Sequence, residues 1–166
     1  DALNKTIELN GSKNVDLINK PVSKEINESL FLVDLGNSTS SGIMHQKNDH
    51  SIILQSTTLD ISITTKIENC IILIDVEGHE LNVVKGAKNL ISNSNPIIIF
   101  EYNYVTKRHF SLLEMEKLLP GYTIFRLNKA GKLDLEFTNT WNCVAIPDKF
   151  KLNFLQVSSS NSKITR

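Results

Sequence analysis

The pattern of hydrophobic and polar positions is clearest in the middle of the chain, where two unbroken apolar runs flank a stretch with helical spacing. Residues 70–74 read CIILI and end at Asp75, and residues 97–100 read IIIF and end at Glu101. Such runs are typical of strands that are covered on both faces in a parallel sheet. The apolar positions between them fall on one helical stripe, namely Val83, Val84, Ala87, Leu90 and Ile91. The pattern predicts a strand, a helix and a parallel strand, with Gly86 marking close packing of helix on sheet.

Weaker patterns precede this unit. Residues 3–11 have apolar positions at helical spacing and end in Asn-Gly, which predicts a helix closed by a left-handed residue. Residues 15–18 and 29–33 predict two short strands. Residues 36–49 are polar and rich in Asn, Ser and Gly, so they predict a long loop or an irregular hairpin.

The last third of the chain predicts a helix and three strands. Ser111 and Glu114 have the spacing of a capping box at the start of a helix. Residues 122–127 and 132–137 alternate around a turn, which predicts a hairpin, and residues 143–146 predict one further strand. We therefore expect an antiparallel pair to close the sheet.

Composition limits the class of protein. The chain has 166 residues, of which 40% are hydrophobic, and this suits one α/β domain over residues 1–150 with a polar tail over residues 151–166. The 18 basic and 18 acidic side chains cancel without forming runs, so nothing favours nucleic acid or an anionic membrane surface as a partner. No apolar stretch is long enough to span a membrane, and we expect a cytoplasmic protein. Because the sequence opens at Asp1 without methionine, we expect a segment of a longer protein.

The two cysteines do not indicate a metal site or a redox site. Cys70 and Cys143 lie inside apolar runs, far apart and without the spacing of zinc ligands. We expect both to be buried structural thiols.

Acidic residues gather where the two central strands end. A right-handed crossover brings the carboxyl ends of two parallel strands to one edge of the sheet, and ligands of open α/β sheets bind outside that edge. We therefore expect Asp75 and Glu101 to stand within reach of one substrate. Glu77, His79 and Glu80 crowd the same turn.

Two other interpretations of these residues stay open. A helix that begins near His79 favours acidic residues in its first turn, so Asp75, Glu77 and Glu80 are compatible with a capping role alone. The side chains of Asp75, Glu77, His79 and Glu101 also have the chemistry to hold a divalent cation. No helix is expected close to Glu101, which favours a functional role for that carboxylate, although an ion pair with Lys107 or Arg108 is the alternative.

The segment IDVEGHE at 74–80, with VVKGA at 83–87 and the strand at 96–101, resembles the FkbM family of S-adenosylmethionine-dependent methyltransferases. Supporting similarity lies at residues 9–11, 57–60, 121–122 and 142–147, so the resemblance covers most of residues 3–147. It implies a class I methyltransferase fold, which is a Rossmann-like, mostly parallel sheet with an antiparallel C-terminal strand. It also implies S-adenosylmethionine as the cofactor.

In that family a glycine-rich loop after the first strand cradles the cofactor, and an acidic residue after the second strand holds its ribose. This sequence shows neither feature, so the resemblance implies an incomplete sheet from the C-terminal part of the domain, inactive by itself. What remains of the cofactor site would be Asp75 and the turn formed by Pro21, Val22 and Ser23, where such folds contact adenine.

The leading hypothesis is a methyltransferase that acts on a hydroxyl of a small-molecule acceptor: a sugar, a lipid or a secondary metabolite. Methyl transfer needs alignment and a base, and the candidate catalytic side chains are Asp75, Glu77, His79 and Glu101. No metal is assigned in this hypothesis. One alternative is a non-catalytic α/β binding or interaction module, since a fold does not determine a function. The other is a metal-dependent hydrolase built on Asp75, Glu77 and Glu101.

Overall fold

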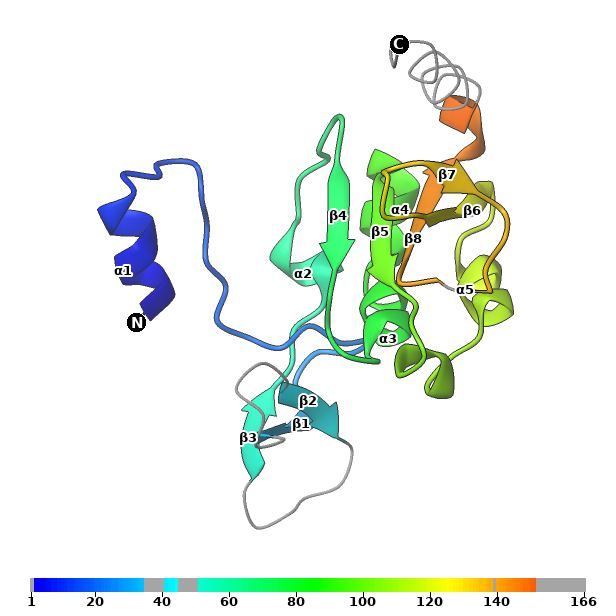
Figure 1. Ribbon diagram of the computed structural model, residues 1–166. Coiled ribbons are helices and arrows are strands. Elements are labelled where there is room, and N and C mark those ends of the chain that lie inside the picture. Colours follow the sequence, from blue (N-terminus) through cyan, green and yellow to red (C-terminus); the bar gives the residue numbers. More distant parts are fainter. Residues whose placement is uncertain (1, 35–40, 45–50, 139, 152–166) are drawn as a thin grey trace.

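The computed structural model describes residues 2–34, 41–44, 51–138 and 140–151, and its largest element is a mixed sheet of five strands (Figure 1). The strand order is β4-β5-β8-β6-β7. The strands are β4 (Ile71–Ile74), β5 (Ile97–Glu101), β6 (Tyr122–Leu127), β7 (Leu133–Asp134) and β8 (Asn142–Pro147). The helices that accompany this sheet are α2 (Leu59–Ser62), α3 (Glu80–Lys85), α4 (Lys88–Ser94) and α5 (Leu112–Leu118).

The predicted strand-helix-strand unit is confirmed, with β4 and β5 parallel, but its helix is divided in two. α3 ends at Gly86, and α4 starts after Ala87. A Cβ on Gly86 would lie 2.1 Å from the carbonyl oxygen of Ser23, so only glycine allows this approach. The close packing expected at Gly86 is therefore present, but its partner is the turn around Ser23 and not the sheet.

The expectation of a mostly parallel sheet is wrong for the described part of the chain. Only the β4–β5 pair is parallel there, while β5–β8, β6–β8 and β6–β7 are antiparallel. The last strand, β8, is antiparallel as expected, yet it lies between β5 and β6 and not at the edge. After β5 the chain first forms the β6–β7 hairpin at the edge of the sheet. It then returns as β8, which fills the place between β5 and β6.

The prediction that residues 70–74 are covered on both faces is also wrong. One face of the sheet packs against α3, α4 and α5 through a core that includes Ile74, Ile98 and Phe100. On the other face Ile71 and Leu73 are 64% and 71% exposed, because β4 is the edge strand and a smaller apolar cluster on that face is centred on β6 and β8. The apolar run marks a strand correctly but does not reveal what covers it.

A separate antiparallel sheet with the order β2-β1-β3 precedes the main one. Its strands are β1 (Ser29–Asp34), β2 (Ser41–Met44) and β3 (Ser51–Gln55), so the strand expected at 29–33 is confirmed and β3 was not predicted. Strand β2 falls within the loop or hairpin expected at 36–49, whose other positions lie outside the described residues.

The helix expected near the start is present as α1 (Ala2–Leu9), followed by Gly11 with a left-handed φ of +61°. The strand expected at residues 15–18 is wrong, since this segment is exposed and pairs with no strand among the described residues. An isolated parallel bridge joins Val22 to Thr57 further along.

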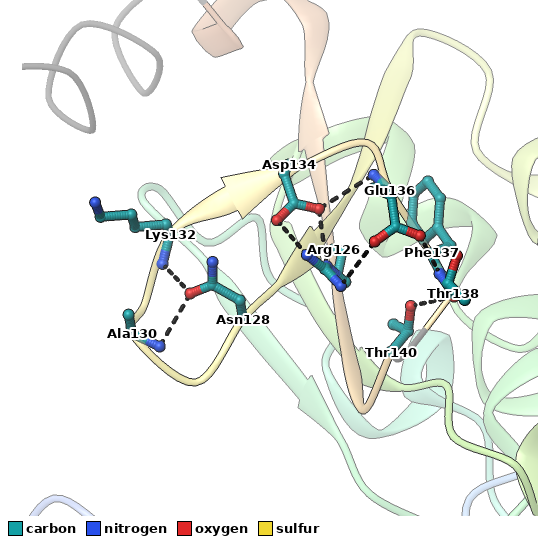
Figure 2. Close-up of polar contacts among 9 residues, drawn as sticks. All are labelled: Arg126, Asn128, Ala130, Lys132, Asp134, Glu136, Phe137, Thr138 and Thr140. Carbon is teal, nitrogen blue, oxygen red and sulfur yellow. Dashed lines mark hydrogen bonds and ion pairs between the residues drawn. The ribbon is translucent and has the colours of Figure 1, made fainter.

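The capping box predicted at the start of α5 is confirmed: Ser111 accepts from the backbone of Glu114, whose carboxylate accepts from the backbone of Ser111. The predicted hairpin is also present, but β7 is shorter than expected. Figure 2 shows the reason. The carboxylate of Asp134 accepts from the backbone of Glu136, whose own carboxylate accepts from the backbone of Thr138, so side chains replace strand partners here. Arg126 on β6 donates two hydrogen bonds to Asp134, at 2.8 and 2.7 Å, and joins the two strands.

The cysteines differ in their surroundings. Cys143 is fully buried on β8, and burial raises the pKa of its thiol to about 12, so the expected buried thiol is confirmed there. Cys70 is only partly buried. No helix within the described ranges is long and apolar enough to cross a membrane. The cytoplasmic location stays a prediction, and the tail expected at 151–166 lies outside the described residues except for Lys151.

Candidate functional site

The two central strands bring their acidic ends together, as predicted. Ile74 of β4 pairs in register with Phe100 of β5. The next residue of each strand, Asp75 and Glu101, therefore lies at the same edge of the sheet. Asp75, Glu77 and Glu101 each offer a carboxylate oxygen, and these three atoms lie within 4.8 Å of one another. Asp75 and Glu77 are exposed, whereas Glu101 is half-buried. We call these three residues the acidic group.

The loop after β4 holds Glu77 in an unusual backbone conformation. Glu77 has a φ of +51°, which is uncommon for a residue with a side chain, and Gly78 follows with a φ of +101°. A Cβ on Gly78 would lie 2.6 Å from the ring of His109. The sharp turn that these two residues make places the Glu77 carboxylate beside the strand ends.

Glu101 has surroundings that raise the pKa of its carboxyl group above the ordinary glutamate value. Burial raises the pKa of Glu101, and the negative charges of Glu77 and Asp75 raise it further. Asn103 acts in the opposite direction, since its Nδ2 donates a hydrogen bond of 2.7 Å to Oε1 of Glu101. The other oxygen, Oε2, is buried and has no hydrogen-bond partner among the described residues.

The sequence pattern places Glu80 at the start of a helix, where acidic side chains usually point to solvent. In the structure its side chain is buried instead. It is fully buried, and its Oε1 accepts a hydrogen bond of 3.1 Å from the backbone of Gly78. Its Oε2 has no partner within the described part of the chain. Burial raises the pKa of Glu80, and the charge of Asp75 adds to this rise. The sequence offered no sign of its burial, because acidic residues in a first helical turn are usually exposed.

His79 is not brought into the acidic group. It is 4% exposed, and its Nε2 lies 3.0 Å from the Oγ of Ser23 while its Nδ1 lies 3.2 Å from the side-chain amide of Asn82. His79 thus lies between α3 and the turn around Ser23. The catalytic role predicted for His79 stays a prediction, while both of its ring nitrogens are engaged by Ser23 and Asn82.

The expected cofactor turn fits a cofactor only in part. Ser23 is fully buried, and its hydroxyl donates to Glu28 at 2.6 Å, so it is not available to a ligand. Pro21 instead lines a hollow of about 630 Å³, together with Val76, the first turn of α1, residues 17–20 and apolar side chains of β1 and β3. Val76 directly follows Asp75, so the hollow adjoins the acidic group. Its mainly apolar wall suits a flat purine ring.

Comparisons with known proteins bear on the family and the fold of the chain. The sequence model of a family described as the methyltransferase FkbM domain matches residues 4–130. No curated protein sequence matches the chain. The structure is similar to the crystal structure of methyltransferase FkbM from Methylobacillus flagellatus KT, with a TM-score of 0.51 and 16% sequence identity over 87% of this chain. The similarity covers 32% of that protein's chain, and at this identity it bears on the fold alone.

Proposed function

Because the chain belongs to the FkbM methyltransferase family, we propose that it forms the acceptor side of an enzyme that methylates a hydroxyl oxygen with S-adenosylmethionine. The observation that carries the proposal is the acidic group at the ends of β4 and β5, beside an apolar hollow. The family match favours methyl transfer over a non-catalytic module and over a metal-dependent hydrolase.

Pro21 and Val76 are the residues that would lie against the adenine of the cofactor, since both line the hollow. Ser23, whose hydroxyl is committed to Glu28, and Val22, whose backbone pairs with Thr57, would support the turn from behind. S-adenosylmethionine, when bound, supplies an electrophilic methyl group on a positively charged sulfur. Asp75 adjoins Val76 and would lie between the hollow and the acceptor.

Glu101 is the side chain best suited to accept the proton of the acceptor's hydroxyl. A carboxylate with a raised pKa is a stronger base than an exposed one, and such catalysis contributes about 10² to 10⁴-fold in rate. Glu101 would take up the proton that the acceptor's hydroxyl gives up when it is methylated. Asn103 would hold this carboxylate in position through its hydrogen bond.

The exposed carboxylates of Asp75 and Glu77 would accept hydrogen bonds from further hydroxyl groups of the acceptor. Several acceptors in one small area suit a substrate with several donors, which favours a sugar or a sugar-bearing molecule over a lipid or a secondary metabolite with a single hydroxyl.

The test is transfer of a labelled methyl group to a panel of monosaccharides, glycolipids and phenols, by this chain and by any longer protein that contains it. We expect Glu101→Gln to lower kcat by about 100-fold or more, because the amide cannot accept the proton. The matched control is Glu116→Gln on the exposed surface of α5, which should leave kcat unchanged. Equal rates for the two variants would show that Glu101 is not the base, and a lack of transfer by every form of the protein would contradict the function.

A further inference from the structure

The acidic group has the dimensions of a coordination shell. Its three ligand oxygens, one each from Asp75, Glu77 and Glu101, lie within 4.8 Å of one another. Oxygens around one Mg²⁺ or Ca²⁺ ion bind at about 2.0 to 2.6 Å, so ligands on opposite sides of the ion are roughly 4 to 5 Å apart. One ion can therefore bind all three oxygens once the exposed side chains of Asp75 and Glu77 move closer to Glu101.

A second observation, independent of the exposed acids, points to the same place. Glu80 is fully buried, and its Oε2 lacks a hydrogen-bond partner among the described residues. Buried polar atoms are nearly always paired, so an unpaired carboxylate oxygen needs an explanation. The other oxygen of Glu80 accepts a hydrogen bond of 3.1 Å from the backbone of Gly78, the residue after Glu77, so the buried carboxylate lies against the loop that carries Glu77. Glu101 contributes a further unpaired oxygen, its Oε2.

Among the described residues, no ion pair joins these carboxylates to a positive charge. The ion pairs in the described part of the chain join Lys24 to Glu25 and Arg126 to Asp134 and Glu136, none of them in the acidic group. Carboxylates that crowd together without a cation repel one another, and the repulsion is relieved either by protons or by a bound cation.

We propose that Asp75, Glu77 and Glu101 bind a divalent metal ion, Mg²⁺ or Mn²⁺, and that the buried Glu80 supports the site from beneath. The ligand atoms are all carboxylate oxygens, which suit hard cations. The nearby imidazole of His79 is hydrogen-bonded to Ser23 and Asn82, so the nitrogen ligand that zinc would favour is occupied elsewhere. Because Asp75 and Glu77 are exposed, the ion would keep water or substrate oxygens at its remaining positions.

The ion would also change the roles given above, and this step rests on the proposed function. With the ion bound, Glu101 is its ligand, and the ion itself favours the deprotonated form of an acceptor hydroxyl that binds to it. Metal binding and methyl transfer are measured separately, so failure of one is distinguishable from failure of the other.

The experiment measures the binding of MnCl₂ to the 166-residue chain by electron paramagnetic resonance, with MgCl₂ as a competitor. We expect one Mn²⁺ per chain, displaced by excess Mg²⁺. Asp75→Asn and Glu101→Gln should each weaken binding at least tenfold, and Glu116→Gln should not change it. Circular dichroism establishes that the variants are folded.

Glu77→Gln keeps the test decisive if the other two variants fail to fold, because Glu77 is exposed and supports no core contact. It should weaken Mn²⁺ binding at least fivefold. The proposal is overturned if the unaltered chain binds no Mn²⁺ at millimolar concentration, or if Glu77→Gln binds it as tightly as the unaltered chain. If the chain binds no Mn²⁺ and methyl transfer continues in the presence of a chelator, the metal site is contradicted but the proposed function is not.

Discussion

The Oγ of Ser23 lies 3.0 Å from the Nε2 of His79, a contact that joins positions 56 residues apart. The Ser23 hydroxyl donates its proton to Glu28, so His79 must donate to Ser23 through Nε2. The Nδ1 of the same ring then accepts from Asn82. These hydrogen bonds engage both ring nitrogens of the buried His79.

His79→Ala should therefore lower the free energy of unfolding by about 1 to 3 kcal/mol, because buried Ser23 and half-buried Asn82 each lose a hydrogen-bond partner. Urea unfolding measures this change. His109→Ala, at an exposed histidine, is the control and should cost less. A stable His79→Ala protein that has lost methyl transfer would show instead that His79 is catalytic.

Gly86→Ala should be more damaging than its small size suggests. The new Cβ would lie 2.1 Å from a backbone oxygen, so the Ser23 turn must move, at a cost of about 1 to 3 kcal/mol or more in the free energy of unfolding. Gly131→Ala is the comparison, since that site is open and only its φ of +73° is unfavourable, at about 1 to 2 kcal/mol. Thermal melting of both variants checks this prediction. Gly131→Ala should have the higher melting temperature of the two.

Stability should fall as the pH rises above the ordinary glutamate pKa of 4.5, because burial raises the pKa of Glu80 in the folded protein. The folded state then holds a proton that the unfolded chain has released, so unfolding becomes easier through this pH window. Glu80→Gln should flatten the slope and raise the stability at neutral pH. The lowered pKa values of Asp134 and Glu136 make stability rise with pH instead. That contribution lies at lower pH, at and below the ordinary pKa values of these groups. An unchanged slope in Glu80→Gln, from urea melts at several pH values, would contradict this account.

Tyr122→Phe should leave stability unchanged or raise it by up to about 1 kcal/mol. The hydroxyl of Tyr122 is buried without a hydrogen-bond partner among the described residues, and removing such a group removes its desolvation cost. Burial also raises the pKa of Tyr122 to about 12. Ultraviolet titration should show a tyrosine that ionises near that value in the unaltered protein and is absent from the variant. A loss of stability in the variant would reveal a bond that the hydroxyl makes.

Asn103→Asp should move the acidic limb of the pH–rate profile to higher pH. The substitution keeps the oxygen that accepts from the backbone of Val105 and Thr106, but it replaces the donor to Glu101 with a negative oxygen. The pKa of Glu101 then rises, and less of the base is available at neutral pH. If the limb stays in place while kcat falls, Asn103 acts in another way.

The sequence by itself determined the elements whose signals are local. The apolar runs that end at Asp75 and Glu101 predicted two parallel strands, and Ser111 with Glu114 predicted the start of α5, because each pattern depends on neighbouring residues alone. The meeting of the two carboxylates followed from the handedness of the crossover, which is nearly invariant.

Tertiary structure decided what each of these residues contacts. Periodicity tells which side chains share a face, but not whether another element covers it, so Leu73 is exposed although its run is typical of a buried strand. Likewise a helix start favours acids in general, and only the packing of the loop over α3 buries Glu80 and turns His79 toward Ser23. Contacts between residues far apart in the chain leave no local pattern in the sequence. Such contacts decide that the acidic group lies at the sheet edge while Glu80 and His79 are buried beside it.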